Sequence, residues 1–401
     1  MLGRFLDEQH SQEVRDHVTR LTVARFVGNT GLRFAQPYLG VIGRSLGVSL
    51  STMGVATSFG EFTGLLGPLV GHQLNKRSRR ASMSLALCVL SLGTALAGAA
   101  PSVAAISVGF VVLSLGKIMF DNGMNSWLVE RTEYATRGRV VGLTEIAWAG
   151  AILIGIPLLA ILVFATSWRY AYGAIALCLV LMAWHLWRHL PKDRPTGHLD
   201  GARTAIVWSL PAAAGFVSFG LVMAIGGCLF VSFGSWLKDV HGFSSLGIGA
   251  VSILLGTVEL LASTSTVRFT DRWGKRRSIR VGVMVALPAA VGLAFVGHQA
   301  ALGLMLLSVL SLGFEFAVVS FASLLPSLQP HSPSTAFGLA VGVGTVSRGI
   351  VAIASTRLYT AHGIGGSSLL AAGMATAALV TLNFVTEPAR QALPAERNER
   401  A

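Results

Sequence analysis

Charged side chains are scarce in this sequence. Asp, Glu, Lys and Arg together make up 12% of its 401 residues, about half the share of a typical soluble domain. Apolar residues make up 53%, glycine adds 46 residues, and the mean hydropathy is +0.65. This composition excludes a soluble enzyme and a disordered protein, and it indicates a protein that crosses a membrane many times.

Cysteine is also rare, and the usual signatures of catalysis are missing. Cys88, Cys178 and Cys228 each lie in an apolar stretch and form no CxxC pair, which argues against a disulfide framework or a metal site. The sequence contains no ATP-binding loop of the form GxxxxGK followed by Ser or Thr, and no Ser-His-Asp or metal-hydrolase signature. It therefore predicts no enzyme activity, no cofactor and no bound metal.

Long apolar runs occur twelve times, and each is long enough for a membrane-spanning helix of about 20 residues. They cover 21–43, 47–71, 81–100, 103–129, 140–164, 169–190, 207–236, 246–267, 278–297, 301–325, 336–357 and 367–386. A stretch rich in charge and proline separates the first six from the last six. We therefore expect an N-terminal six-helix bundle over 1–190, a cytoplasmic linker over 191–206 and a C-terminal bundle over 207–401.

Basic residues are concentrated in the loops on one side of the expected membrane. The net charge is +13, yet the loops of the other side hold little beyond Arg44, Arg169 and Lys238. Because cytoplasmic loops carry an excess of Lys and Arg, this distribution places both termini in the cytoplasm. We expect a monomer that spans the lipid bilayer of the cell membrane and has no nucleic-acid partner.

The two halves repeat a basic loop in the same place. The sequence GHQLNKRSRR occupies 71–80, and VRFTDRWGKRR occupies 267–277, each after the second expected helix of its half. An isolated acid precedes each loop, Glu61 in the first half and Glu259 in the second. A duplicated six-helix unit is typical of secondary transporters.

With these loops the sequence resembles the major facilitator superfamily, and within it the twelve-helix drug:proton antiporters and arabinose-efflux-permease-like proteins. The family's loop signature GxxxDRxGRR is matched at Gly71, Arg79, Asp271, Arg272, Gly274 and Arg276. The first copy has Asn75 in place of the acid. QPYLGVIGRSLGVS (36–49) and RGRVVGL (137–143) add to the resemblance. It implies an all-α membrane fold of two pseudo-symmetric six-helix bundles.

The resemblance also implies that both loops act as conformational latches. The carboxylate of Asp271 would face the start of the span 140–164, where a helix dipole favours negative charge by about 0.3–1 kcal/mol. Asn75 would face the start of the span 336–357, and its uncharged amide predicts a weaker latch. The alternative is that both loops only anchor the chain at the cytoplasmic surface through their positive charge.

Two expected helices carry a polar stripe. Arg25, Asn29, Arg33 and Gln36 share a face of the span 21–43, and Ser114, Lys117, Asp121 and Asn125 share a face of the span 103–129, each within an arc of about 80°. In the resembled family these helices line the central cavity together with the helix that carries Glu315. The resemblance therefore implies substrate-binding roles for Asn29, Arg33, Gln36, Lys117, Asn125 and Glu315.

Asp121 and Glu61 are the candidates for proton coupling. A charge at the bilayer centre costs about 2.5–3.5 kcal/mol, so it suggests a function. Asp121 would be ion-paired in one state and protonated in another, with Arg33 at a similar depth. The alternative is that Lys117 and Asp121, four residues apart, merely neutralise each other.

Further pairs are expected where the two halves meet. By analogy with the family, Arg348 would pair with Glu61, and Glu145 with Glu259 or Arg268. For Glu61 and Glu259 the alternative is a buried carboxyl group bonded to a neighbouring helix.

The expected function is secondary active transport, with efflux of a small organic molecule in exchange for protons. One alternative is proton symport or facilitated uptake of a small anionic solute, which Arg33 and Lys117 suggest. Another is a membrane sensor that has the same fold and transports nothing.

Overall fold

The computed structural model describes residues 2–6, 10–67, 78–133, 137–192, 208–329 and 333–386. Within these residues all regular structure is helical and no strand occurs. The predicted all-α membrane fold is confirmed.

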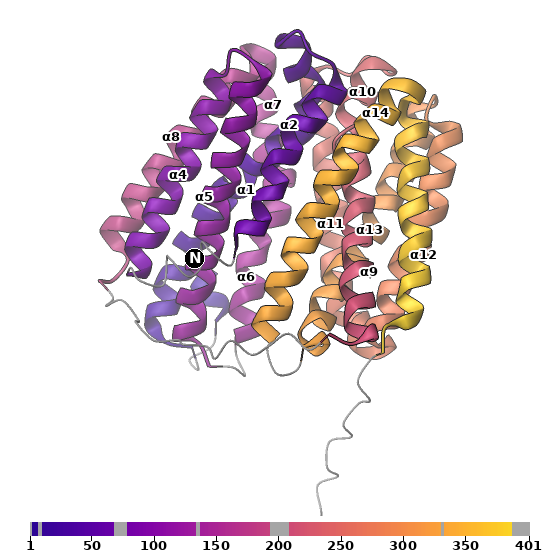
Figure 1. Ribbon diagram of the computed structural model, residues 1–401. Coiled ribbons are helices and arrows are strands. Elements are labelled where there is room, and N and C mark those ends of the chain that lie inside the picture. Colours follow the sequence, from indigo (N-terminus) through magenta and orange to yellow (C-terminus); the bar gives the residue numbers. More distant parts are fainter. Residues whose placement is uncertain are drawn as a thin grey trace, which may run out of the picture.

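The first half of the chain forms six spans, which lie on the left in Figure 1. They follow a short 3-10 turn, η1 (Leu2–Phe5). The second span continues α2 into the turn η2, and the fifth joins α6 to α7 through the π-helical turn η3. The elements are α1 (Gln12–Ser45), α2 (Leu50–Phe62), η2 (Thr63–Leu66), α4 (Arg79–Ala99), α5 (Val103–Arg131), α6 (Arg137–Gly150), η3 (Ala151–Gly155), α7 (Ile156–Ala165) and α8 (Trp168–His189).

The second half forms the remaining spans. Its elements are α9 (Leu210–Phe230), α10 (Phe233–Asp239), α11 (Ser245–Trp273), α12 (Lys275–Val296), α13 (Ala300–Leu328), α14 (Pro333–Thr381) and the short η4 (Leu382–Phe384). The helix α14 holds two spans, because Gly363 has a φ of 62° and breaks the helical path. Glycine adopts this left-handed conformation at little cost.

The helix count is consistent with twelve spans. Nine helices of the described residues are long and apolar enough to cross a membrane. In that number α14 counts once, although Gly363 divides it. The nine do not include α1, which carries several charges, or α2, which is short within the described residues. With these two helices and the second span of α14, the total is the predicted twelve.

Glycines let the third and fourth spans of each half pack backbone against backbone. A methyl group on Gly93 of α4 would lie 2.1 Å from the backbone nitrogen of Leu113 in α5. In the second half, a methyl group on Gly282 of α12 would lie 2.6 Å from the carbonyl oxygen of Gly313 in α13. Small residues permit such close helix packing in membranes. The two halves thus use the same packing at equivalent helix pairs.

The two halves meet closely at the end of the bundle where α1 finishes and α10 lies, the upper end in Figure 1. We call it the distal end, and the opposite end, where α1 begins and α8 finishes, the proximal end. A methyl group on Gly234 of α10 would lie 1.8 Å from the carbonyl oxygen of Pro37 in α1. Beside this contact, Arg44 pairs with Asp239 at 2.7 Å.

Two further helix pairs continue this distal contact on either side. Ser58 of α2 donates a hydrogen bond to the Gly349 carbonyl of α14 at 2.7 Å. On the other side, a methyl group on Gly249 of α11 would lie 2.5 Å from the Cβ of Ala160 in α7. The distal end is therefore sealed by contacts that leave no room for larger side chains.

Candidate functional site

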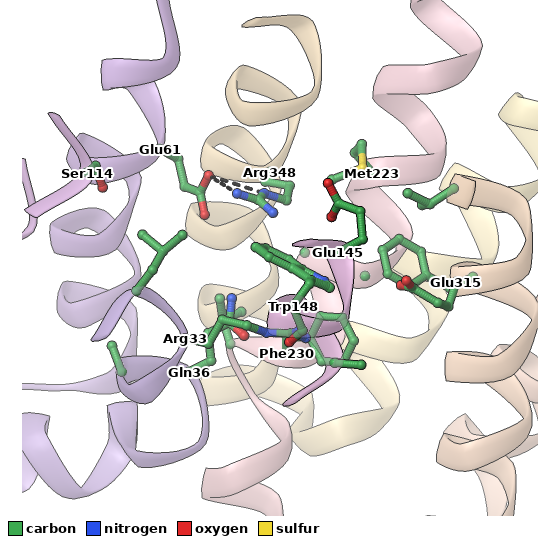
Figure 2. A pocket seen from close by; sticks show the side chains of 18 of the residues that line it. Arg33, Gln36, Glu61, Ser114, Glu145, Trp148, Met223, Phe230, Glu315 and Arg348 are labelled. Carbon is green, nitrogen blue, oxygen red and sulfur yellow. Dashed lines mark hydrogen bonds and ion pairs between the residues drawn. The ribbon is translucent and has the colours of Figure 1, made fainter. Parts of the chain in front are cut away.

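A cavity of about 740 Å³ lies between the two halves (Figure 2). Its lining comes from α1, α2, α5, α6, α8, α9, α11, α13 and α14. On α1 it reaches Leu39, just below the distal seal, and on α6, α11 and α14 it includes Glu145, Thr266 and Phe337 from the proximal parts of these helices. The cavity thus extends from the centre of the bundle toward the proximal end.

The cavity wall is mainly apolar and aromatic, with a few charged groups. Phe110, Trp148, Tyr172, Phe230 and Phe314 supply rings, and Arg33, Glu61, Glu145, Glu315 and Arg348 supply charge. An apolar wall with a small number of placed polar groups is typical of a site for an organic ligand.

Arg33 of α1 and Glu259 of α11 form an ion pair that joins the two halves. The Nη2 and Nη1 atoms of Arg33 donate to Oε1 and Oε2 of Glu259 at 2.7 and 3.0 Å, and the side chains are only 3% and 1% exposed. The guanidinium also lies 4.5 Å from the centre of the Trp148 ring. It donates to the Trp148 carbonyl at 3.3 Å. Two parallel hydrogen bonds make this the strong form of an arginine–carboxylate pair.

A π-helical turn follows Trp148 and shapes the helix beside Arg33. It spans Ala151–Gly155, and a methyl group on Gly155 would lie 2.3 Å from the hydroxyl oxygen of Thr30 in α1. Pro157 lies two residues after the turn and has no backbone N–H to donate. Such turns occur often at functional sites, and here the turn lets α1 approach the helix that carries Trp148.

Glu315 of α13 lies beside the Arg33–Glu259 pair and lines the cavity. Its side chain is buried, at 6% exposure, and it is close enough to Glu259 and Arg33 to interact electrostatically with both. The Ser263 hydroxyl of α11 donates to its Oε1 at 3.4 Å. Within the described part of the chain, no cation forms an ion pair with Glu315. Figure 2 shows Glu315 and Glu61 on opposite sides of the cavity.

Glu61 of α2 and Arg348 of α14 form a second ion pair between the halves. The Nη2 and Nε atoms of Arg348 donate to Oε2 of Glu61 at 2.6 and 3.1 Å (Figure 2). This confirms the pair expected from the sequence. It forms because α2 packs along α14.

A third group of charges lies within the first half. Arg25 of α1 donates to Glu145 of α6 at 2.7 Å, and its Nε lies 3.5 Å from Asp121 of α5. Lys117 donates to the other oxygen of Asp121. Asp121 thus contacts Lys117 and Arg25, while Arg33 is engaged by Glu259 across the bundle.

The prediction that Glu145 pairs with Glu259 or Arg268 was wrong. Glu145 pairs with Arg25 and not with Glu259 or Arg268, because the proximal part of α6 lies against α1. Glu259 is therefore left to pair with Arg33.

The predicted substrate-binding and coupling residues divide into two sets. Arg33, Gln36, Glu61 and Glu315 line the cavity, whereas Asn29, Lys117, Asp121 and Asn125 are not among its described lining residues. Asn29 is fully buried, with both amide atoms unpaired among the described residues. Asn125 is exposed. Lys117 pairs with Asp121, and Asp121 also contacts Arg25, so neither side chain faces the cavity.

The predicted latch falls partly outside the described residues. Gly71, Asn75 and the side chain of Asp271 lie outside them. Gly274 has a φ of 87° and makes the turn between α11 and α12. Arg79 pairs with Glu130 of α5 at 2.6 Å, Arg276 donates to the Asn383 carbonyl at 2.9 Å, and Arg272 is exposed. The contact of Arg79 with Glu130 lies within the first half, and that of Arg276 with Asn383 lies within the second.

Sequence reasoning did not include Glu259, Trp148 and Arg25 among the site residues. Glu259 and Arg25 were visible as isolated charges in apolar runs, which is the signal that could have found them. Their partners depend on which helices cross, and one sequence does not specify that.

Comparison with known proteins decides the family. Residues 21–356 match the sequence profile of the Major Facilitator Superfamily. This protein belongs to the major facilitator superfamily. A curated relative in Bacillus subtilis, the uncharacterized MFS-type transporter YwfA, is 24% identical over 387 residues, which cover 91% of this chain and 89% of the relative. The predicted family is confirmed, and it is one of membrane transporters rather than enzymes.

Solved structures share the fold. A bacterial homologue of the human lysosomal transporter Spinster, in an inward-facing and occupied conformation, superposes with a TM-score of 0.72 and 16% identity, covering 94% of this chain and 95% of that chain. A D-xylose–proton symporter superposes with a TM-score of 0.74 and 15% identity, covering 92% of this chain and 98% of that chain. At these identities the similarity concerns the fold alone.

Proposed function

We propose that this superfamily transporter is a proton-coupled exporter of a small amphipathic molecule that is neutral or cationic. The proposal rests on the environment of Glu315. Its carboxyl group is buried in the cavity wall and accepts a hydrogen bond from a hydroxyl group, but it forms no ion pair with a cation among the described residues. It lies beside the ion pair of Arg33 and Glu259 that joins the two halves.

The charge balance around the cavity supports a proton on Glu315. The wall and its adjoining network contain the carboxyl groups of Glu61, Asp121, Glu145, Glu259 and Glu315 and the cations Arg25, Arg33, Lys117 and Arg348. Among the described residues, each of these carboxyl groups except that of Glu315 has a cationic partner. Since an unpaired buried carboxylate is costly and becomes neutral instead, Glu315 carries a proton in this conformation.

The cavity wall supports a neutral or cationic substrate over an anionic one. Both arginines among its described lining residues already pair with carboxylates, Arg33 with that of Glu259 and Arg348 with that of Glu61. An anion would have to displace one of these partners. Aromatic faces such as Phe230 and Trp148 attract cations as well as apolar groups. The surplus carboxyl group of Glu315 favours a cation further.

These groups suggest how transport and protons are linked. A cationic substrate next to Glu315 favours its carboxylate form, so substrate binding releases the proton, and by linkage protonation releases the substrate. Opening of the distal end requires the halves to separate at Arg33 and Glu259. If the proximal end faces the cytoplasm, as the distribution of basic residues predicts, one substrate moves outward as one proton moves inward.

The candidates proposed from the sequence remain alternatives. Asp121 is held by Lys117 and Arg25, and Glu61 by Arg348. Protonation of either carboxylate would first have to release a paired cation, a step that Glu315 does not need.

Membrane vesicles test the proposed function. A growth-inhibition panel of lipophilic cations and neutral amphiphiles, comparing cells with and without the protein, identifies candidate substrates. Everted vesicles with an acidic interior should then concentrate those compounds, and dissipation of the pH gradient should release them. Accumulation only in right-side-out vesicles would indicate uptake instead. A panel with no difference, and vesicles with no transport, would indicate the sensor.

A further inference from the structure

A surface at the proximal end of α4 and α8 combines exposed tryptophans with arginines. Trp184 and Trp187 of α8 are 57% and 50% exposed. The guanidinium carbon of Arg188 lies 5.5 Å from the centre of the Trp184 ring, and that of Arg80 in α4 lies 4.5 Å from the Trp187 ring. We call these four residues the α4–α8 surface.

An exposed apolar stripe runs along α8 up to this surface. Leu177, Val180 and Leu181 are 61%, 48% and 49% exposed. They precede Trp184 by seven, four and three residues, so they share its face of the helix. On a membrane-spanning helix such a face meets lipid chains, and tryptophan rings prefer the level of the headgroups.

Positive charge follows directly after the tryptophans. Arg188 in the last turn of α8 and Lys192, three residues beyond the helix, are exposed, and Arg80 reaches over Trp187 from α4. A guanidinium that stacks on a ring keeps its donors in one plane, the geometry that recognises phosphate through two bonds. The order along α8 is therefore aliphatic, indole and guanidinium, which matches the order of acyl chain, glycerol and phosphate in a phospholipid.

We propose that the α4–α8 surface binds an anionic phospholipid, with its phosphate on Arg80 and Arg188 and an acyl chain along Leu177 and Leu181. Charge complementarity selects the anionic lipid over a zwitterionic one, because each basic residue near a membrane surface attracts anionic lipid by roughly fivefold in affinity. The proposal is independent of the substrate and of the coupling ion.

Native mass spectrometry of the purified full chain, with equimolar phosphatidylglycerol and phosphatidylcholine, tests it. The wild type should retain phosphatidylglycerol preferentially, and the substitutions R80Q and R188Q should each lower this preference by roughly fivefold. The double substitution R277Q/R280Q removes two charges from the start of α12 at the same end and measures the loss that comes from general surface charge, and R80Q/R188Q should exceed that loss. Substitution by lysine at both positions of the surface should give an intermediate preference, since charge is kept and planar recognition is lost.

A second measurement covers the case in which a glutamine variant folds poorly. In bilayers, brominated phosphatidylglycerol should quench the fluorescence of Trp184 and Trp187 more than brominated phosphatidylcholine does. The variants W184F and W187F show how much of the quenched fluorescence comes from each of these two tryptophans. The proposal would be overturned by equal quenching by the two lipids or by an unchanged lipid preference in R80Q/R188Q. It would also be overturned if millimolar inorganic phosphate displaced the lipid, or if a dimer buried these tryptophans.

Discussion

Arg33 and Glu259 are 226 residues apart in the sequence, yet two hydrogen bonds of 2.7 and 3.0 Å join them at the centre of the bundle. The pair connects α1 of one half to α11 of the other. Because its charges are almost completely buried, each depends on the other for compensation. The pair therefore stabilises the arrangement in which the distal end is closed, and it must be released when the halves move apart.

Removal of one partner should destabilise the protein more than removal of both. Glu259→Gln leaves the buried guanidinium of Arg33 without its ion-pair partner, which costs about 3–5 kcal/mol. Arg33→Gln combined with Glu259→Gln should cost clearly less. The free energy of unfolding in detergent micelles, from denaturant titration, measures both. As a control, Asp239→Asn removes the exposed partner of Arg44 and should cost no more than about 1 kcal/mol. Additive losses in the double variant would show that the two charges are not coupled.

A bulky side chain in the distal seal should open the distal end. A methyl group on Gly249 would already lie 2.5 Å from Ala160, so Gly249→Leu prevents α11 from packing on α7. Spin labels at Ser45 and Val240, both exposed near the distal end, should report a longer distance in this variant. Gly173→Leu is the matched control, since nothing lies within 4 Å of a methyl group there. An unchanged distance distribution in Gly249→Leu would contradict the seal.

The latch proposed from the sequence predicts an asymmetry between the two basic loops. Asp271→Asn should slow transport much more than Asn75→Ala, because only Asp271 brings a negative charge to a helix N-terminus. Initial rates of substrate transport at matched expression make the comparison. Equal loss in the two variants would remove the asymmetry, and no loss in either would favour the alternative that both loops only anchor the chain.

The sequence was sufficient for the fold and for one ion pair between the halves. Long apolar runs and paired basic loops predicted the superfamily, and the adjacency of equivalent helices in that superfamily predicted the pair of Arg348 and Glu61. A polar stripe, however, gives the direction of a helix face and not the identity of its neighbour. For that reason the prediction that Lys117 and Asp121 line the cavity was wrong: they pair with each other, and Asp121 also contacts Arg25 within the first half.

The same limit explains the partner of Arg33. The depth of Arg33 and Asp121 suggested that the two interact during transport, but α11 crosses α1 at the centre and supplies Glu259. Close glycine contacts such as that of Gly256 with Leu153 pack α11 on the π-helical turn η3, and this packing brings Glu259 to Arg33. Such contacts arise from packing in three dimensions, and a single sequence shows only that the glycine is present.

Glu315→Gln offers the most direct test of the coupling site. The purified variant in proteoliposomes should still exchange a neutral substrate across the membrane without a gradient, because glutamine keeps the size of the side chain and needs no cation. Exchange of a cationic substrate should be slower, because the carboxylate that favours it is gone. The variant should fail to concentrate substrate when a pH gradient is imposed, since it carries no exchangeable proton. Asp121→Asn, measured under the same conditions, tests the coupling residue predicted from the sequence. If Glu315→Gln still concentrates substrate and Asp121→Asn does not, the coupling proton belongs to Asp121 and the assignment to Glu315 is wrong.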